Sequence, residues 1–109
     1  MEELRTRIDG IDRRLVRLLN ERAGCAVALG RIKLQRGLTI YQPAREEEVL
    51  ENIQRSNGGP LESAALRRLF ERIIDESRRI ERSATDRSGA PGAPRGPASG
   101  PARPEDAKD

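Results

Sequence analysis

Two basic side chains, Arg22 and Lys33, are spaced so that together they can hold a small anion. They lie eleven residues apart, which at about 100° per residue returns Lys33 to within about 20° of the helix face that carries Arg22. That separation corresponds to roughly 16 Å of helical backbone, so two long side chains can lean toward each other across it. Arg31 points about 180° away from Arg22 and is expected in solvent. The pair therefore predicts a clamp for a small dianion.

Four further polar residues are candidates for the same site. Ser77 interrupts an apolar stripe and Glu81 follows one helical turn later, while Arg45 and Glu46 stand just inside the start of an expected helix. Each has an ordinary explanation: a small core serine bonded to its own helix, a solvated acid, and a charged helix start. An arginine such as Arg22, taken alone, more often pairs with an acid across a helix interface or extends its charge to solvent than binds a ligand. Only the combination favours a binding site.

The residues before Gly37 are expected to form one long helix. Apolar side chains recur every three or four positions, which predicts a helix over about residues 2–35 with one face turned to a core or a partner. Gly10, Gly24 and Gly30 lower its helix propensity, and Gly37 ends it. The stripe consists of Leu4, Ile8, Ile11, Leu15, Leu18, Cys25, Leu29 and Ile32.

Two shorter helices follow. Pro43 suits the first helical position behind Gln42 as N-cap, and the acidic residues 46–48 complement the helix dipole. This helix should stop near Asn57. The next is expected to begin at Pro60 and to continue to Arg82, with an apolar stripe of Leu66, Phe70, Ile73 and Ile80.

The composition changes after Arg82. Residues 83–109 hold five prolines and four glycines and no apolar side chain larger than alanine. Such a segment buries too little surface to offset its ordering entropy, so it is expected to be a disordered tail. The fold class predicted is therefore all-α, with a helical domain over residues 1–82.

The composition also bounds the core and the chemistry. With 35% hydrophobic residues in 109, and Tyr41 and Phe70 as the sole aromatic residues, one chain cannot build a deep core, and a second copy would share it. Cys25 is the one cysteine and histidine is absent, which excludes an internal disulfide and argues against a metal site or a nucleophile–base pair. The charged N-terminus and the lack of a long apolar run predict a cytoplasmic protein without a membrane span.

Four stretches of the sequence, in this order, resemble the all-helical AroQ class (type II) of chorismate mutases. The resemblance implies an intertwined homodimer that rearranges the dicarboxylate chorismate to prephenate, as an isomerase of the shikimate pathway and aromatic amino-acid biosynthesis. The four stretches span nearly all of residues 4–82, and they read LRTRIDGID, LLNERAGCAVALGRIK, IYQPAREEEVL and LFERIIDESRRIE.

The resemblance implies catalytic roles for three residues. Arg22 would clamp one carboxylate, and Lys33 would contact a carboxylate and the ether oxygen of the substrate. Glu81 would face that ether oxygen opposite Lys33, to which it can donate a hydrogen bond only when protonated.

Substrate-binding roles are implied for five more residues. Arg5 would reach into the partner's site to hold a carboxylate, Arg45 would support the site electrostatically, and Ser77 would assist at the ring carboxylate. Glu46 would accept a hydrogen bond from the ring hydroxyl. Gln42 stands near that hydroxyl, where the family often has aspartate.

Helix geometry supports the dimer independently. Arg5 and Arg22 lie seventeen residues apart, roughly 25 Å along one helix, which is farther than a molecule of chorismate's size can bridge. If both serve one site, they come from different chains, and an isologous dimer with two equivalent sites follows.

The residue inventory fits the implied chemistry. The rearrangement is pericyclic and needs neither nucleophile, proton transfer, metal nor cofactor. It needs a compact conformer held for reaction and positive charge beside the breaking ether bond, which Arg22 and Lys33 can supply.

Two kinds of alternative stay open. On the same fold, the chain could be an isochorismate pyruvate lyase or a 4-amino-4-deoxychorismate mutase, because Gln42 departs from the family where these substrates differ. The other is a non-enzymatic helical dimerisation or nucleic-acid-binding module, prompted by 21 basic residues and a pI of about 9.7. Against the latter, basic and acidic residues are interleaved and no aromatic stacking platform is evident.

Overall fold

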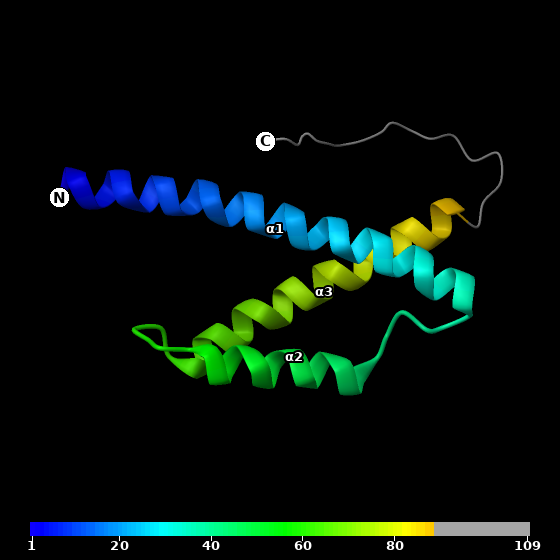
Figure 1. Ribbon diagram of the computed structural model, residues 1–109. Helices are drawn as coiled ribbons and strands as arrows, with labels where there is room; N and C mark the ends of the chain where they lie inside the picture. The colour runs from blue at the N-terminus through cyan, green and yellow to red at the C-terminus, as the bar shows by residue number, and fades with distance from the viewer. Residues whose placement is uncertain (89–109) are drawn as a thin grey trace.

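The computed structural model describes residues 1–88 as three α-helices joined by two loops (Figure 1). They are α1 (Glu2–Arg36), α2 (Pro43–Ser56) and α3 (Ser63–Ser88), and no strand occurs within the described residues. α1 crosses α3 near the C-terminal halves of both helices, while α2 runs beside the N-terminal half of α3. The predicted all-α class, with one long, one short and one medium helix, is confirmed.

The end of α1 and the start of α2 lie where the sequence predicts them. Gly37 takes the left-handed conformation at φ 68°, and the N–H groups of Gly37 and Leu38 donate to the carbonyls of Leu34 and Lys33. Pro43 opens α2 behind Gln42, whose side chain makes no capping hydrogen bond within the described residues. The Gln42 amide therefore remains available to the space that the first turn of α2 faces.

The prediction that α3 begins at Pro60 is wrong, because the side chain of Asn57 organises the residues before the helix. Its Nδ2 donates to the Leu61 carbonyl at 2.8 Å, and its Oδ1 accepts from the Gly59 N–H at 2.9 Å. Gly59 takes φ 73°, a conformation that favours glycine. α3 consequently begins at Ser63.

α3 also extends farther than expected, through Ser88 instead of ending at Arg82. Residues 83–88 contain neither glycine nor proline, so the helical hydrogen bonds continue, and Ala84 is buried. The change of composition that predicts a tail from residue 83 thus begins six residues before the helix ends. The remainder of the predicted tail, residues 89–109, lies outside the described residues.

The crossing of α1 and α3 depends on Gly30. A Cβ atom built on Gly30 would lie 2.6 Å from the Glu81 carbonyl oxygen and 2.9 Å from the Glu81 Cα, which no side chain tolerates. Ala26, one turn earlier on the same face, is also buried. Because Arg22 and Lys33 flank these two small residues on that face, the close approach brings both basic side chains against α3.

Replacement of Gly30 by alanine is expected to destabilise the protein by about 1–3 kcal/mol, since the methyl group would press on α3 backbone that cannot yield. Gly24→Ala is the matched control, because Gly24 has open space around its Cα and the alanine raises helix propensity by up to about 1 kcal/mol. Urea unfolding followed by circular dichroism measures both. Equal stabilisation by the two substitutions would contradict the proposed contact.

A second helix pair is joined by charge. Arg67 on α3 contacts Glu47 on α2 at 3.0 Å and donates to Gln54 on α2 at 3.3 Å. The hydrogen bond with Glu47 raises the pKa of Arg67 above its ordinary value, and Glu71 contributes in the same direction. These contacts hold α2 on α3 at the end of the pair that lies away from the Gly30 crossing.

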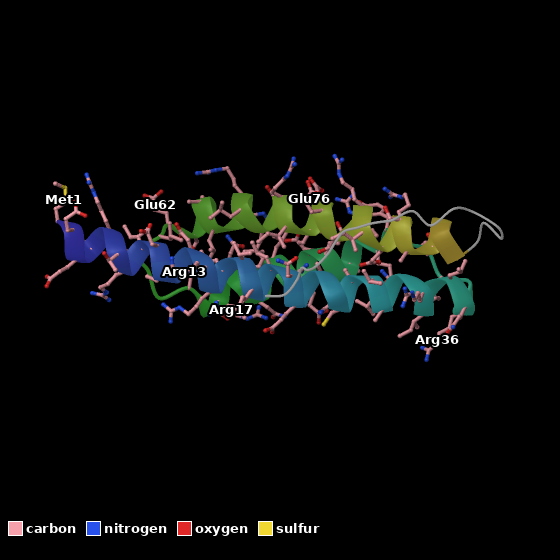
Figure 2. All side chains as sticks on the ribbon, turned by 90° about the horizontal axis from the view of Figure 1, so that it is seen from above. Met1, Arg13, Arg17, Arg36, Glu62 and Glu76 are labelled. Atoms are coloured by element: carbon pink, nitrogen blue, oxygen red, sulfur yellow. The ribbon has the colours of Figure 1, made fainter. Side chains whose placement is uncertain are left out.

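The chain buries little apolar surface by itself. Its principal extents are 53 × 32 × 15 Å, and the smallest exceeds one helix diameter only slightly. Four apolar residues count as buried within the described side chains: Ala26, Leu50, Ile74 and Ala84. In Figure 2, Arg36 and Glu76 project outward on opposite sides of the molecule. The stripe along the N-terminal half of α1 stays open, with Leu4 60% and Leu18 58% exposed.

Candidate active site

A cleft of about 460 Å³ lies where the three helices converge. α1 contributes Arg22 and Lys33, α3 contributes Ser77 and Glu81, and the first turn of α2 with the residue before it contributes the remaining predicted polar groups. The apolar walls are Cys25, Ala26, Leu29, Ile40, Val49 and Ile74. Charged groups at the ends and apolar walls between them suit a small polar molecule with an apolar ring.

The structure brings together seven of the eight predicted site residues. Those lining the cleft are Arg22, Lys33, Gln42, Arg45, Glu46, Ser77 and Glu81. Arg5 is the exception: it lies near the opposite end of α1, its side chain is 63% exposed, and it pairs with Glu2 one turn away. Within one chain, Arg5 therefore takes no part in the cleft.

Arg22 and Ser77 contact each other across the helix crossing. Arg22 Nη1 donates a hydrogen bond to Ser77 Oγ, and both residues are half-buried. Ser77 is therefore not simply a core serine bonded to its own helix. The contact fixes the guanidinium at one end of the cleft, with further N–H groups left to donate to a ligand.

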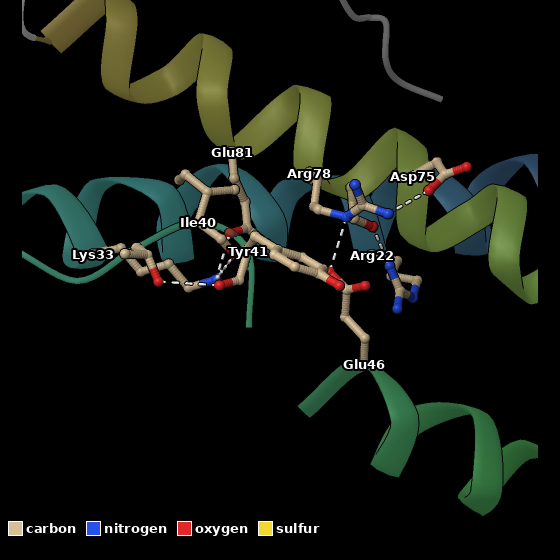
Figure 3. Close-up of polar contacts among 10 residues, drawn as sticks. Arg22, Lys33, Ile40, Tyr41, Glu46, Asp75, Arg78 and Glu81 are labelled. Carbon is tan, nitrogen blue, oxygen red and sulfur yellow. Dashed lines mark hydrogen bonds and ion pairs between the residues drawn. The ribbon is translucent and has the colours of Figure 1, made fainter. Parts of the chain in front are cut away.

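Lys33 and Glu81 form a buried ion pair at the other end (Figure 3). Lys33 Nζ lies 2.6 Å from Glu81 Oε1, and the two side chains are 12% and 9% exposed. Nζ also donates to the Ile40 carbonyl at 3.2 Å, which ties the loop between α1 and α2 to the cleft. In the free chain Glu81 accepts from Lys33, so a ligand atom must enter between groups that are already positioned.

Arg78 also lines the cleft, and sequence reasoning missed it. Its Nε lies 2.9 Å from Glu46 Oε2, its Nη2 donates to Asp75, and its guanidinium lies 5.4 Å from the centre of the Tyr41 ring. A signal for it exists in the sequence, because Ile74, Arg78 and Glu81 share one helix face at steps of four and three. Arg78 does not interrupt the apolar stripe of α3, so the spacing of apolar residues does not mark it.

The charge of the cleft suits a dianion. Among the described residues that line it, four are cationic, Arg22, Lys33, Arg45 and Arg78, and two carry carboxylates, Glu46 and Glu81. The N-terminal end of α2 adds the positive end of a helix dipole. The excess of positive charge equals the charge of a dicarboxylate.

Arg45 occupies the rim of the cleft. Its side chain is 63% exposed, and Nη1 contacts Glu48 at 2.8 Å on the same helix. An exposed arginine of this kind is well placed to attract and steer an anion rather than to enclose it.

Within residues 1–88, no group of three histidine, cysteine, aspartate or glutamate side chains is arranged to hold a metal ion. In the same part of the chain, no helix is both long and apolar enough to cross a membrane.

A family model described as chorismate mutase type II matches residues 4–82. The chain belongs to the type II chorismate mutase family. The predicted resemblance is thereby confirmed, and the matched range contains every predicted site residue.

Three bifunctional chorismate mutase/prephenate dehydratases are similar to this chain. The protein of Neisseria gonorrhoeae is 43% identical over 81 residues, which cover 74% of this chain and 22% of that protein. Those of Aquifex aeolicus and Pseudomonas aeruginosa are 41% and 37% identical over 86 residues, and each alignment covers 24% of the relative. This chain of the type II family thus spans about a quarter of the length of these curated relatives.

A solved chorismate mutase (form II) from Thermus thermophilus has the same fold. It superposes with a TM-score of 0.73 at 36% sequence identity, and the match covers 74% of this chain and 92% of that one. The type II fold therefore accounts for nearly all of that structure and for most of this chain.

Proposed function

We propose that this chain is a chorismate mutase, an isomerase that rearranges chorismate to prephenate. The observation that carries the proposal is the cleft itself: Arg22 and Lys33 from one helix meet Ser77 and Glu81 from another, with an excess of positive charge. The family match and the similarity to proteins named as chorismate mutases support the same reaction. We further propose a cytoplasmic place in aromatic amino-acid biosynthesis.

The chemistry required is conformational restraint and charge stabilisation. Arg22 clamps one substrate carboxylate, while Lys33 contacts the other carboxylate and the ether oxygen. The ether C–O bond breaks as the new C–C bond forms, so no proton or electron leaves the substrate. Holding the two ends of the molecule together lowers the entropic part of the barrier. The Lys33 ammonium stabilises the negative charge that develops on the ether oxygen.

At the ring hydroxyl, Glu46 accepts a hydrogen bond and Gln42 lies nearby. Glu46 belongs to the first turn of α2, Gln42 immediately precedes that helix, and both line the cleft. Ser77 assists at the ring carboxylate beside Arg22, with which it is hydrogen-bonded. These contacts orient the ring relative to the clamp.

A second copy of the chain completes the site by supplying Arg5. The open stripe of α1, the small thickness of the chain and its few buried apolar residues support a shared core. The separation of Arg5 from Arg22, roughly 25 Å along α1, supports assigning the two arginines of one site to different chains. The proposed assembly is a symmetric homodimer with two sites.

Glu81→Gln is expected to keep or increase the turnover of chorismate, because a glutamine amide can donate a hydrogen bond to the ether oxygen and places no negative charge beside it. The Glu81 carboxylate instead accepts a hydrogen bond from Lys33 in the free chain. Initial rates of chorismate consumption measure the effect. Glu71→Gln, on the exposed side of α3, should leave the rate unchanged. A large loss of turnover in Glu81→Gln alone would show that the site needs the carboxylate and not a hydrogen-bond donor at this position.

The activity itself is tested by incubating the purified chain separately with chorismate, isochorismate and 4-amino-4-deoxychorismate, and identifying products by NMR. The proposal predicts prephenate from chorismate as the fastest reaction. Faster formation of salicylate with pyruvate, or faster rearrangement of the amino compound, would replace it with the corresponding alternative. Salt-sensitive binding to duplex DNA without turnover would favour a nucleic-acid-binding module.

A further inference from the structure

We infer that Arg78 is a specificity-determining residue that makes the cleft select a ring hydroxyl over a ring amine, by neutralising the charge of Glu46. The inference rests on the proposed function, and it concerns the end of the cleft opposite Lys33 and Glu81. Nothing in the apolar pattern of the sequence marks Arg78; its role follows from where α3 and α2 bring it.

The guanidinium of Arg78 is held on three sides. Nε lies 2.9 Å from Glu46 Oε2, Nη2 donates to Asp75, and the Tyr41 ring centre is 5.4 Å from Cζ. The Arg78 and Glu46 side chains are 29% and 21% exposed, so solvent screens their interaction only in part. Figure 3 shows Glu46 reaching from α2 toward Arg78, beside Tyr41.

The contact with Arg78 offsets the negative charge of Glu46 but leaves the carboxylate oxygens of Glu46 free to accept hydrogen bonds. Nε is buried and forms no hydrogen bond with any described residue, although it lies within ion-pair distance of Glu46. Glu46 therefore keeps lone pairs for a hydroxyl donor, while its negative charge is offset.

This end of the cleft consequently has no excess of negative charge, because Arg78 contacts both Glu46 and the more exposed Asp75, and Arg22 lines the same end. Gln42, which stands where aspartate is common in the family, is neutral, and Glu46 is paired. This charge balance does not weaken the binding of a neutral hydroxyl, because a hydroxyl needs only an oxygen that accepts its hydrogen bond. An aliphatic amine is cationic at neutral pH, and it would meet the Arg78 charge without a free carboxylate to offset it.

A purely structural role for Arg78, as a link between α2 and α3, makes a different prediction. Arg67 already joins these helices through Glu47 and Gln54. If Arg78 were only a second link, its loss would lower the activity toward all substrates in parallel. The ratio of kcat/KM for chorismate to kcat/KM for the amino compound distinguishes the two roles. A smaller fraction of folded protein lowers both values equally and leaves the ratio unchanged.

The test compares chorismate with 4-amino-4-deoxychorismate at neutral pH in the full chain. Arg78→Met should reduce the ratio of kcat/KM for chorismate to kcat/KM for the amino compound by about tenfold, chiefly through KM, since it leaves the Glu46 charge unpaired. Arg78→Lys keeps the charge and should hold the ratio within about threefold of wild type. Arg79→Met is the matched control, because Arg79 is the exposed neighbour on α3, and it should leave the ratio unchanged.

Glu46→Gln provides an opposite variant that does not depend on Arg78→Met being folded. It removes the carboxylate and leaves Arg78 in place, so the amine should be rejected more strongly and the ratio should rise. Parallel losses for both substrates in Arg78→Met, or an unchanged or lower ratio in Glu46→Gln, would overturn the inference. If the wild type does not rearrange chorismate, the proposed function fails and the inference fails with it.

Discussion

Arg22→Ala is expected to lower kcat/KM for chorismate by roughly a hundredfold or more, while the chain stays folded and keeps the dimeric state proposed above. Removing one preorganised donor from a polar active site typically costs about 10²–10³ in rate, or about 3 kcal/mol. Arg22 also holds Ser77 through a hydrogen bond between helices, so the alanine variant loses both the clamp and the group that orients its neighbour. Steady-state kinetics with sedimentation or light scattering measures activity and assembly together.

Arg31→Ala is the control for this variant, because Arg31 lies on the same helix with its side chain exposed on the other face. Its activity should stay within about twofold of wild type, as surface substitutions usually do. Dissociation of the Arg22→Ala dimer with little change in the chemistry of the remaining dimer would instead make Arg22 a charge at a helix interface.

Arg5→Ala is expected to cause a loss of similar size, although Arg5 lies outside the cleft of its own chain. Its only ion pair in the described residues is with Glu2, and an exposed pair one helical turn apart contributes little to stability. A large loss of turnover with an unchanged unfolding midpoint would therefore come from the site of the partner chain. Chorismate kinetics and thermal unfolding of the same preparation provide both readouts.

Arg7→Ala is the matched control for Arg5, since Arg7 is a nearby exposed arginine of α1. Wild-type activity in Arg5→Ala would contradict the shared site. Loss of activity in Arg7→Ala as well would point to the general positive charge of this part of α1.

Much of the fold follows from local rules. The steps of three and four between apolar residues define α1. Gly37 ends α1 in the left-handed conformation, and Pro43 opens the first turn of α2. The rotation of about 100° per residue places Arg22 and Lys33 on one face of α1, and both line the cleft. Properties carried by a single helix are therefore readable from a single sequence.

Properties that depend on how two helices pack against each other could not be predicted from the sequence. Gly30 reads in the sequence only as a loss of helix propensity, yet it permits the contact with the α3 backbone at Glu81. Arg78 lies on a predictable face, but its pairing with Glu46 requires the approach of α2 to α3. Likewise, the start of α3 at Ser63 depends on hydrogen bonds from Asn57 that no periodicity encodes.

If each site is built from two chains, mixing two inactive variants should restore activity. Arg5→Ala and Arg22→Ala chains, each nearly inactive alone, are unfolded together, refolded and assayed with chorismate. About half of the dimers are then mixed, and each mixed dimer has one site with both arginines and one site with neither. About a quarter of wild-type activity should then be recovered. Activity no higher than the sum of the two separate variants would show that Arg5 and Arg22 do not serve one site from different chains.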